Sequence, residues 1–187
     1  MSNLQIISTH IILVGFKNVG KSSIGLALSS RLDRKFVDLD DQIIAEHWLA
    51  TGEKLSCREL MKSKGEDFFR KIEHQVLKKV LDQSEPFVLA LGGGTPLLAE
   101  NRELLKNHLI VHVSAPKSIV FERIMINGKP AFFPQQKQSF DTFQELWSER
   151  EPVFEQISDI KVCNTGSIEE AVEKINLALA SSKKKSN

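Results

Sequence analysis

A stretch near the amino end, Gly15 to Ser22, reads G-F-K-N-V-G-K-S and fits the pattern G-x-x-x-x-G-K-[S/T]. Two glycines at this spacing let the main chain turn so that its N–H groups surround an anion. In such a loop the lysine, here Lys21, reaches the outer phosphates of a nucleotide, and the hydroxyl of Ser22 binds Mg²⁺. An apolar run precedes the loop and a helical apolar pattern follows it, so the loop is predicted to bind nucleotide phosphates. The alternative is a glycine-rich turn without a ligand.

Acidic and basic residues farther along the chain could complete a site for phosphoryl transfer. Asp38 and Asp40 close a strand predicted over 35–40, and residues two apart in an extended chain project on the same side. Arg70 and Arg150 each lie on a predicted helix. Phosphoryl transfer depends mainly on positioning and charge stabilisation, so a metal-holding carboxylate and arginines around a small acceptor are what it requires.

Each of these residues also has an ordinary structural explanation. Asp40 or Asp41 could simply cap the next helix. Arg70 could form a surface ion pair with Glu66, four residues before it, and Arg150 lies among glutamates. The paired spacing favours function for the two aspartates, whereas both explanations stay open for the arginines.

Three successive glycines, Gly92, Gly93 and Gly94, follow an apolar run. Each loses backbone entropy on folding and one would suffice for a turn, so a ligand close to the main chain explains the three better. Two other nucleotide-binding classes lack support. The chain has neither the guanine-reading N-K-x-D of GTPases nor the apolar run ending in Asp-Glu that motor ATPases usually carry.

Composition limits the class of protein further. A chain of 187 residues with 41% hydrophobic residues is the usual size of one domain. The formal net charge of +1 gives no general attraction for nucleic acid or membrane. Cys57 and Cys163 fit neither a disulfide framework nor a zinc site, so we expect buried, reduced thiols. With no signal-like segment and no membrane-length apolar run, we expect a cytoplasmic protein.

Apolar runs and helical periodicity alternate along the chain. Strands are predicted over 11–14, 35–40, 87–91, 109–113 and 160–163. Helices are predicted after the phosphate loop and over 41–48, 56–62, 66–81, 95–107, 116–126, 141–156 and 168–180. Thr95-Pro96 has the form of an N-cap followed by proline at the first helical position. The alternation predicts an α/β fold, with a largely parallel five-stranded sheet between two layers of helices and ligands at the carboxyl ends of the strands.

Two segments exceed what a simple connection needs. Residues 41–64 add helix between the second and third strands, which is room for a substrate-binding cap. Residues 127–140 carry Gly128 and two prolines with little periodicity, which suggests a lid over the phosphates; a surface loop is the alternative. The tail over 181–187, rich in lysine, is expected to be disordered.

Taken together, the motifs resemble those of shikimate kinases, in order and in approximate spacing over nearly the whole chain. The segments that carry the resemblance are Gly15 to Ser22, Asp38-Leu39-Asp40, Gly65 to Glu73 (G-E-D-F-F-R-K-I-E), Gly92-Gly93-Gly94 and Arg150-Glu151-Pro152-Val153-Phe154. The match to G-E-x-x-F-R-x-x-E is the most specific, because a generic phosphate loop does not predict it. The resemblance implies a small nucleoside-monophosphate-kinase-like fold and transfer of the γ-phosphoryl of ATP to the 3-hydroxyl of shikimate, on the route to chorismate and the aromatic amino acids.

The resemblance also implies a role for each matching residue. ATP would be bound by the loop residues Gly15, Asn18, Val19, Gly20, Lys21, Ser22 and Ser23, and one Mg²⁺ by Ser22 and, through water, by Asp38. Asp40 would hold the shikimate hydroxyls and orient or deprotonate the nucleophile. Arg70 and Arg150 would grip the carboxylate, while Gly92, Gly93 and Gly94 would let the backbone approach the ring.

Two positions match less closely. Arg123, near the end of the helix before the lid, resembles the arginine that stacks on adenine, although a surface charge is an equal alternative. The lid carries Lys129-Pro130-Ala131 where the family usually has Arg-Pro-Leu, so Lys129 would supply a point charge instead of a planar fork to ATP and the transferred phosphoryl.

The chain is thus expected to be a monomeric, Mg²⁺-dependent kinase of one domain, with ATP and shikimate as its ligands and no nucleic-acid or membrane partner. Two rivals remain. One is another small-molecule kinase of this fold, acting on gluconate or a nucleoside monophosphate. The other is a degenerate binding protein that has kept the fold without the activity.

Overall fold

The computed structural model describes residues 9–126 and 139–184, and its centre is a five-stranded parallel sheet. The strands are β1 (Ile11–Val14), β2 (Lys35–Asp38), β3 (Phe87–Ala90), β4 (Leu109–Ser114) and β5 (Ile160–Cys163). They lie in the order β2-β3-β1-β4-β5, and every neighbouring pair is parallel. The predicted α/β fold with a five-stranded parallel sheet is confirmed.

Helices connect successive strands, as parallel pairing requires. They are α2 (Lys21–Arg31), α3 (Leu39–Thr51), α4 (Cys57–Lys64), α5 (Glu66–Leu81), the 3₁₀ turn η1 (Thr95–Leu97), α6 (Ala99–Leu105), α7 (Lys117–Ile126), α8 (Ser139–Ile157) and α9 (Ile168–Lys184). Among the described residues, no helix combines the length and the apolar character that crossing a membrane would need.

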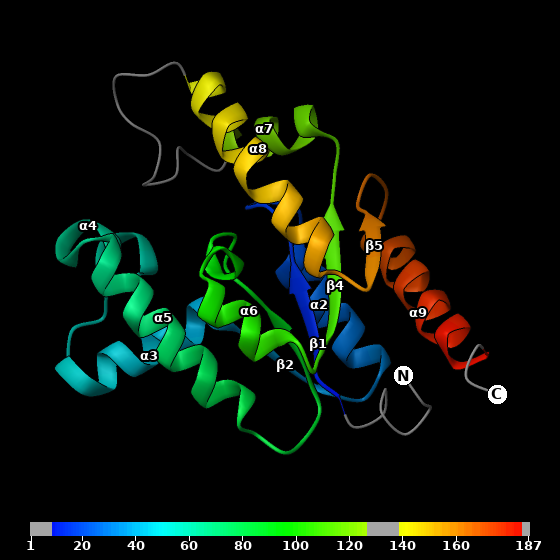
Figure 1. The fold of residues 1–187 in the computed structure, drawn as a ribbon, viewed down its shortest axis with the longest axis horizontal. Helices are drawn as coiled ribbons and strands as arrows, with labels where there is room; N and C mark the ends of the chain where they lie inside the picture. Colours follow the sequence, from blue (N-terminus) through cyan, green and yellow to red (C-terminus); the bar gives the residue numbers. More distant parts are fainter. Residues whose placement is uncertain (1–8, 127–138, 185–187) are drawn as a thin grey trace.

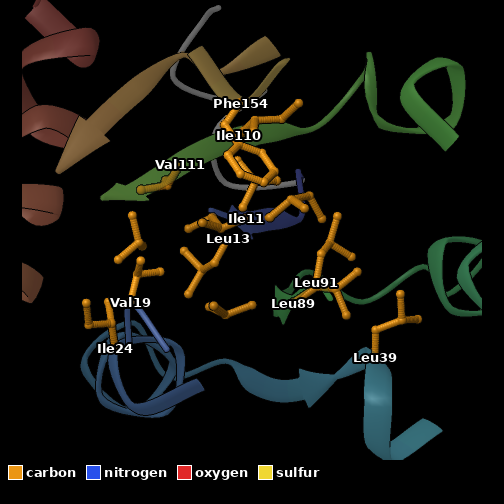
Figure 2. Packing of buried hydrophobic residues seen from close by; sticks show 14 of the residues in the cluster. Ile11, Leu13, Val19, Ile24, Leu39, Leu89, Leu91, Ile110, Val111 and Phe154 are labelled. Atoms are coloured by element: carbon orange, nitrogen blue, oxygen red, sulfur yellow. The ribbon is translucent and has the colours of Figure 1, made fainter. Parts of the chain in front are cut away.

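The sheet is covered on both faces, which gives three layers (Figure 1). The inner strands β1, β3 and β4 are buried along their whole length, as their nearly continuous apolar sequences predict. Helices α2 and α9 pack against each other on one face. Figure 2 shows Phe154 of α8 over Ile110 of β4 on the other face, with Val19 and Ile24 across the sheet from it. The core therefore holds Val19 and Ile24 on one side of these strands and Phe154 of α8 on the other, while Phe16 of the phosphate loop contacts α8 directly.

The sheet order places β1 between β3 and β4, so the chain crosses to both sides of its first strand. At such a point the loops after neighbouring strands diverge, and a crevice opens at the carboxyl ends of the strands. The phosphate loop follows β1 and the glycine triplet follows β3, so both reach that crevice.

The second strand is shorter than the sequence predicts. β2 ends at Asp38 and α3 begins at Leu39, so Asp40 lies in the first turn of a helix. The expectation that the two aspartates project together from one extended strand is wrong. The side chain of Asp38 instead caps α3, because its Oδ1 accepts a hydrogen bond of 3.0 Å from the N–H of Asp40.

Two other predicted helices differ in their limits. The single helix predicted over 95–107 is divided into η1 and α6, and Thr95 caps neither, because its hydroxyl is committed to a buried carboxylate described below. Helix α9 runs to Lys184, four residues beyond its predicted end and into the segment expected to be disordered. Residues 185–187 of that tail lie outside the described residues.

Candidate active site

A cavity of about 410 Å³ opens at the carboxyl ends of the strands and is lined by residues from the loop after β1, β2, α3, α4, α5, the glycine triplet and α8. Its lining brings together most of the predicted site: Asn18, Gly20, Lys21, Ser22, Ser23, Asp38, Asp40, Arg70, Gly92, Gly93, Gly94 and Arg150. These residues come from segments spread over more than a hundred positions of the chain, and only the fold makes them neighbours.

The phosphate loop depends on glycine at its two ends. Gly15 has φ of 140°, and a Cβ there would lie 2.1 Å from the carbonyl oxygen of Val113 on β4. Gly20 has φ of 98°, and a Cβ there would lie 2.5 Å from the side-chain amide of Asn164. Both positions therefore exclude other residues, for conformational reasons and for lack of space. Gly20 is also the residue from which α2 starts, so the positive end of the α2 dipole faces the cavity.

Lys21 folds back over the loop that precedes it. Its Nζ donates hydrogen bonds to the carbonyl oxygens of Gly15, at 2.9 Å, and Phe16, at 2.8 Å. Burial lowers the pKa of Lys21 to about 8, although Asp40 and Asp38 nearby act in the opposite direction. A group with this pKa gains charge stabilisation when phosphates arrive, which suits a lysine that binds the transferred group.

Two amide side chains hold the loop in place. Asn164, which follows β5, is buried and donates from Nδ2 to the carbonyl oxygen of Val19 at 2.8 Å. Asn18 has φ of 64° and donates from Nδ2 to the carbonyl oxygen of Arg123 at 3.4 Å. The loop is therefore held by hydrogen bonds to two other segments of the chain, independently of a ligand.

Ser22 and Asp38 lie together on the phosphate side of the cavity. The Ser22 hydroxyl donates to Oδ2 of Asp38 at 2.6 Å. Because the other carboxylate oxygen of Asp38 caps α3, the orientation of this carboxylate is fixed. Two such oxygens close to the predicted phosphate-binding lysine are hard ligands of the kind that Mg²⁺ takes from proteins when nucleotide phosphates supply the rest.

Asp40 is reached by solvent through the open cavity but is surrounded by protein elsewhere. Desolvation raises its pKa to about 6 from a usual 3.8, and the negative charges of Asp38 and Glu73 raise it further, against the opposing effect of Lys21. A carboxylate with a pKa close to the working pH is suited to accept a proton from a hydroxyl.

Arg70 is held by a buried acidic network. Its Nη1 donates to Oε2 of Glu73 at 2.7 Å, and its Nη2 to Oε1 of Glu66 at 3.4 Å. Glu73 is only 1% exposed, and its second oxygen accepts a 2.7 Å hydrogen bond from the buried hydroxyl of Thr95. The surface ion pair with Glu66 does exist, but the buried contact with Glu73 is the one that orients the guanidinium into the cavity.

Arg150 reaches the cavity from α8 and is 6% exposed. Its guanidinium carbon lies 5.6 Å from the ring centroid of Phe16, which is within range of a cation–π contact. Burial lowers the pKa of Arg150 from its usual value, and the positive charge of Arg70 contributes in the same direction. The cavity thus contains two arginines, held by different means, with Asp40 beside them.

The glycine triplet is needed by the protein itself. A Cβ on Gly94 would lie 2.5 Å from Nη2 of Arg70, and one on Gly92 would lie 3.2 Å from Oδ1 of Asp40. A Cβ on Gly93 would lie 3.3 Å from the backbone nitrogen of Lys17. The interpretation that a ligand alone requires all three glycines is therefore incomplete, because side chains of the site occupy part of that space.

Three predicted site residues do not line the cavity. Gly15 lies at the start of the loop, where it packs closely against the backbone of Val113. Val19 is fully buried, so only its main chain could reach a ligand. Arg123, on the last turn of α7, meets the phosphate loop through its carbonyl oxygen. Lys129 lies outside the described residues.

Sequence reasoning missed three contributors. Glu73 was part of the recognised motif but received no role, although its position three residues after Arg70 on a helix is a signal for pairing. Asn164 gives no signal beyond its place after a strand. Cys57 lines the cavity and is half-buried, while Cys163 is exposed, so the expectation that both thiols are buried is wrong.

Comparisons with known proteins agree with this geometry. The family model described as shikimate kinase matches residues 17–180. The shikimate kinase of Macrococcus caseolyticus is 32% identical over 168 residues, covering 88% of this chain and 93% of the relative. A bifunctional shikimate kinase/3-dehydroquinate synthase of Thermotoga maritima is 32% identical over 145 residues, which are 78% of this chain but 27% of that longer protein.

A solved structure gives the same result for the fold. The shikimate kinase of Acinetobacter baumannii, determined in complex with shikimate, superposes with a TM-score of 0.83 at 27% identity, covering 98% of this chain and 99% of that one. The family match and the superposition each cover the strands and helices that form the cavity. The chain therefore belongs to the shikimate kinase family.

Proposed function

We propose that this chain transfers the γ-phosphoryl group of ATP to the 3-hydroxyl of shikimate, with Mg²⁺ bound at Ser22 and Asp38. The observation that carries the proposal is the presence, in one cavity, of a complete phosphate loop and of a separate group of one carboxylate and two arginines. A phosphate loop alone would fit many nucleotide-binding proteins. The second group is what a small polyhydroxy carboxylic acid would require.

The phosphate side of the cavity supplies the donor site. Loop amides and Lys21 would bind the β- and γ-phosphates, as in other loops of this pattern. Ser22 and Asp38 would hold Mg²⁺, which would neutralise part of the phosphate charge. The hydrogen bond between their oxygens, at 2.6 Å, supports the fit because the two proposed ligands already lie next to each other.

The other side of the cavity supplies the acceptor site. Arg70 and Arg150 would bind the carboxylate of shikimate, for which guanidinium groups have suitable hydrogen-bond geometry. Asp40 would accept the hydrogen bond of the nucleophilic hydroxyl and take its proton during transfer. Asp40 lies in the same cavity as Lys21 and the two arginines, and its pKa responds to the charges of Lys21 and of Glu73, the partner of Arg70. This supports a hydroxyl on Asp40 that would face the transferred phosphoryl group.

Steady-state release of ADP, measured with shikimate, gluconate and AMP in turn, tests the proposal. We expect turnover with shikimate alone. Turnover with gluconate or AMP but not shikimate would replace the acceptor, and inactivity with all three would favour a protein that has kept the fold without the activity. The retention of Lys21, Asp40 and Arg70 in one cavity argues against that last outcome.

The role of Lys129 stays a prediction from the sequence. If its charge replaces that of the usual lid arginine, Lys129→Ala should lower kcat by about a hundredfold, the order expected for loss of one stabilising charge, while ADP binding survives. Kinetics with a parallel calorimetric measurement of ADP affinity would check this, and an unchanged kcat would exclude Lys129 from the chemistry.

A further inference from the structure

We infer that His112 and Glu151 form a buried pair that fixes the rotation of α8 and thereby aims Arg150 into the acceptor site. The inference rests on the proposed function, because it assigns these two residues to the positioning of a group that binds shikimate. Neither residue lines the cavity, so both act through Arg150 and are positioning residues.

His112 occupies an unusual place for an ionisable side chain. It lies on β4 within the buried sheet and is 0% exposed. Both of its ring nitrogens, and Oε2 of Glu151, are buried and form no hydrogen bond with any described group. Burial of such groups is unfavourable unless they are paired. The only acid that comes within ion-pair distance of His112 in the described structure is Glu151, with 3.6 Å between Nε2 and Oε2.

The carboxylate of Glu151 also contacts the neighbouring strand. Lys161 of β5 is the register partner of His112, and its Nζ lies 3.7 Å from Oε1 of Glu151. Lys161 contacts Glu155 of α8 as well. One carboxylate of α8 is therefore held between a histidine on β4 and a lysine on β5, and the buried contact is the one with His112.

Helix α8 needs side-chain contacts at this point because its own hydrogen bonding is interrupted. Pro152 lies inside the helix, and a proline there cannot donate to the carbonyl oxygen four residues earlier and crowds it. Two residues later, the side chain of Phe154 is fully buried, and its ring centroid lies 5.6 Å from that of His112. The turn that carries Arg150 is thus weakened in its backbone and anchored to β4 through Glu151 and Phe154.

Adjacent residues of a helix project roughly 100° apart about its axis. Any rotation that moves Glu151 away from His112 therefore also turns Arg150 away from its place over Phe16. Displacement of a binding group by about 1 Å can change rates by up to a hundredfold. The pair on the sheet side of α8 therefore controls the direction of the guanidinium on the cavity side.

Steady-state kinetics of four proteins test the inference: Glu151→Gln, His112→Gln, the double variant, and Glu155→Gln as a control on the same helix. Glu155 is exposed and contacts Lys161 rather than the buried face. We expect either single substitution at the pair to raise the KM for shikimate roughly tenfold, with kcat and the KM for ATP within about twofold. The KM for shikimate of the double variant should be no higher than that of either single variant, because the two residues act as a unit. Glu155→Gln should match the wild type.

Thermal unfolding of the same proteins separates positioning from general stability. A lower Tm with an unchanged shikimate KM in Glu151→Gln and His112→Gln would overturn the inference, as would additive effects in the double variant or an equal KM increase in Glu155→Gln. If the wild type turns over shikimate and the variants have an unchanged KM for shikimate, the inference is wrong while the proposed function stands. Absence of wild-type shikimate turnover defeats the proposed function and this inference with it.

Discussion

The donor and acceptor sides of the cavity are built in different ways. The donor side is one continuous loop, in which main-chain conformation at Gly15 and Gly20 sets the shape. The acceptor side consists of side chains from α3, α5 and α8, and its charges are held by other buried groups, above all Glu73. On the proposed assignment, phosphate binding is encoded in eight neighbouring residues, whereas recognition of the acceptor would depend on the whole fold.

This difference predicts that the two sides can be damaged separately. A substitution on the donor side should affect ATP and turnover, and one on the acceptor side should affect shikimate. Four sets of variants examine that separation.

Removing the lysine of the loop should have the largest effect. Lys21→Ala should lower kcat by about 10²–10³-fold, as loss of a charge that stabilises the transition state does. Shikimate affinity, measured by calorimetry, should stay within about twofold. Lys17→Ala, at the exposed rim of the cavity, is the control and should change kcat much less. Shikimate affinity falling in parallel with kcat in Lys21→Ala would mean that the sides are not separable.

Removing the first arginine of the acceptor side should raise the KM for shikimate by about a hundredfold, with the KM for ATP within about twofold. Arg70→Ala also leaves Glu73 buried without its cation, and breaking a buried pair in this way costs about 3–5 kcal/mol, so Tm should fall. Glu66→Ala removes the other partner of Arg70, which is 68% exposed, and should change neither the KM for shikimate nor Tm. An equal loss of ATP and shikimate affinity in Arg70→Ala would contradict its assignment to the acceptor side.

The raised pKa of Asp40 gives the acceptor side a pH dependence. Its carboxylate must be unprotonated to act as a base, so kcat/KM should fall about tenfold per pH unit below the pKa of about 6. The pH dependence of stability has the opposite sign, because the free energy of unfolding falls as pH rises. The folded protein holds this proton more tightly than the unfolded chain, so ionised Asp40 destabilises the fold above about pH 6, and that penalty disappears as pH falls towards 3.8.

Asp40→Asn should therefore lower kcat by about a hundredfold, the order expected for loss of a general base, yet have a higher Tm than the wild type at pH 7.5, with the gain shrinking as pH is lowered towards 4. Unfolding followed by circular dichroism across this pH range would measure the gain. A Tm below that of the wild type at pH 7.5 would show that Asp40 stabilises the fold, contrary to its raised pKa.

Adjacent glycines of the triplet should report on different sides of the cavity, with the smallest effects of the four. A methyl group on Gly94 meets the movable guanidinium of Arg70, whereas one on Gly93 meets the backbone of Lys17 in the phosphate loop. We expect Gly94→Ala to raise the KM for shikimate about fivefold, the order of 1 kcal/mol, and Gly93→Ala to raise the KM for ATP by a similar factor. If each variant raised the KM for shikimate and the KM for ATP equally, the two glycines would not belong to different sides of the cavity.

Local sequence predicted the strand, the loop and the helix of the donor side because the requirements of these elements are local. A strand, a loop with fixed glycines and a helix are contiguous, and each has its own pattern. The same holds for the alternation that predicts the parallel sheet, which the structure confirms.

The structure of the acceptor side was harder to predict from local sequence. The cap formed by Asp38 shortened the predicted strand, because hydrogen bonding to the N–H of Asp40 outweighed the extended pattern. The position of Thr95 was misjudged because its partner, Glu73, is 22 residues away in sequence and becomes a neighbour only in the folded chain. Nothing in the pattern of β4 indicated that His112 would face an acid on α8.

The thiol in the cavity has a consequence for chemical labelling. Burial raises the pKa of Cys57 to about 12, and the negative charges of Asp40 and Glu73 add to the effect, so this sulfur stays protonated at neutral pH and is a poor nucleophile. Cys163 lies exposed at the edge of the sheet. An alkylating reagent should therefore mark Cys163 first and leave Cys57 unmodified, so that a fluorophore can be attached to this protein without a label on a residue that lines the cavity.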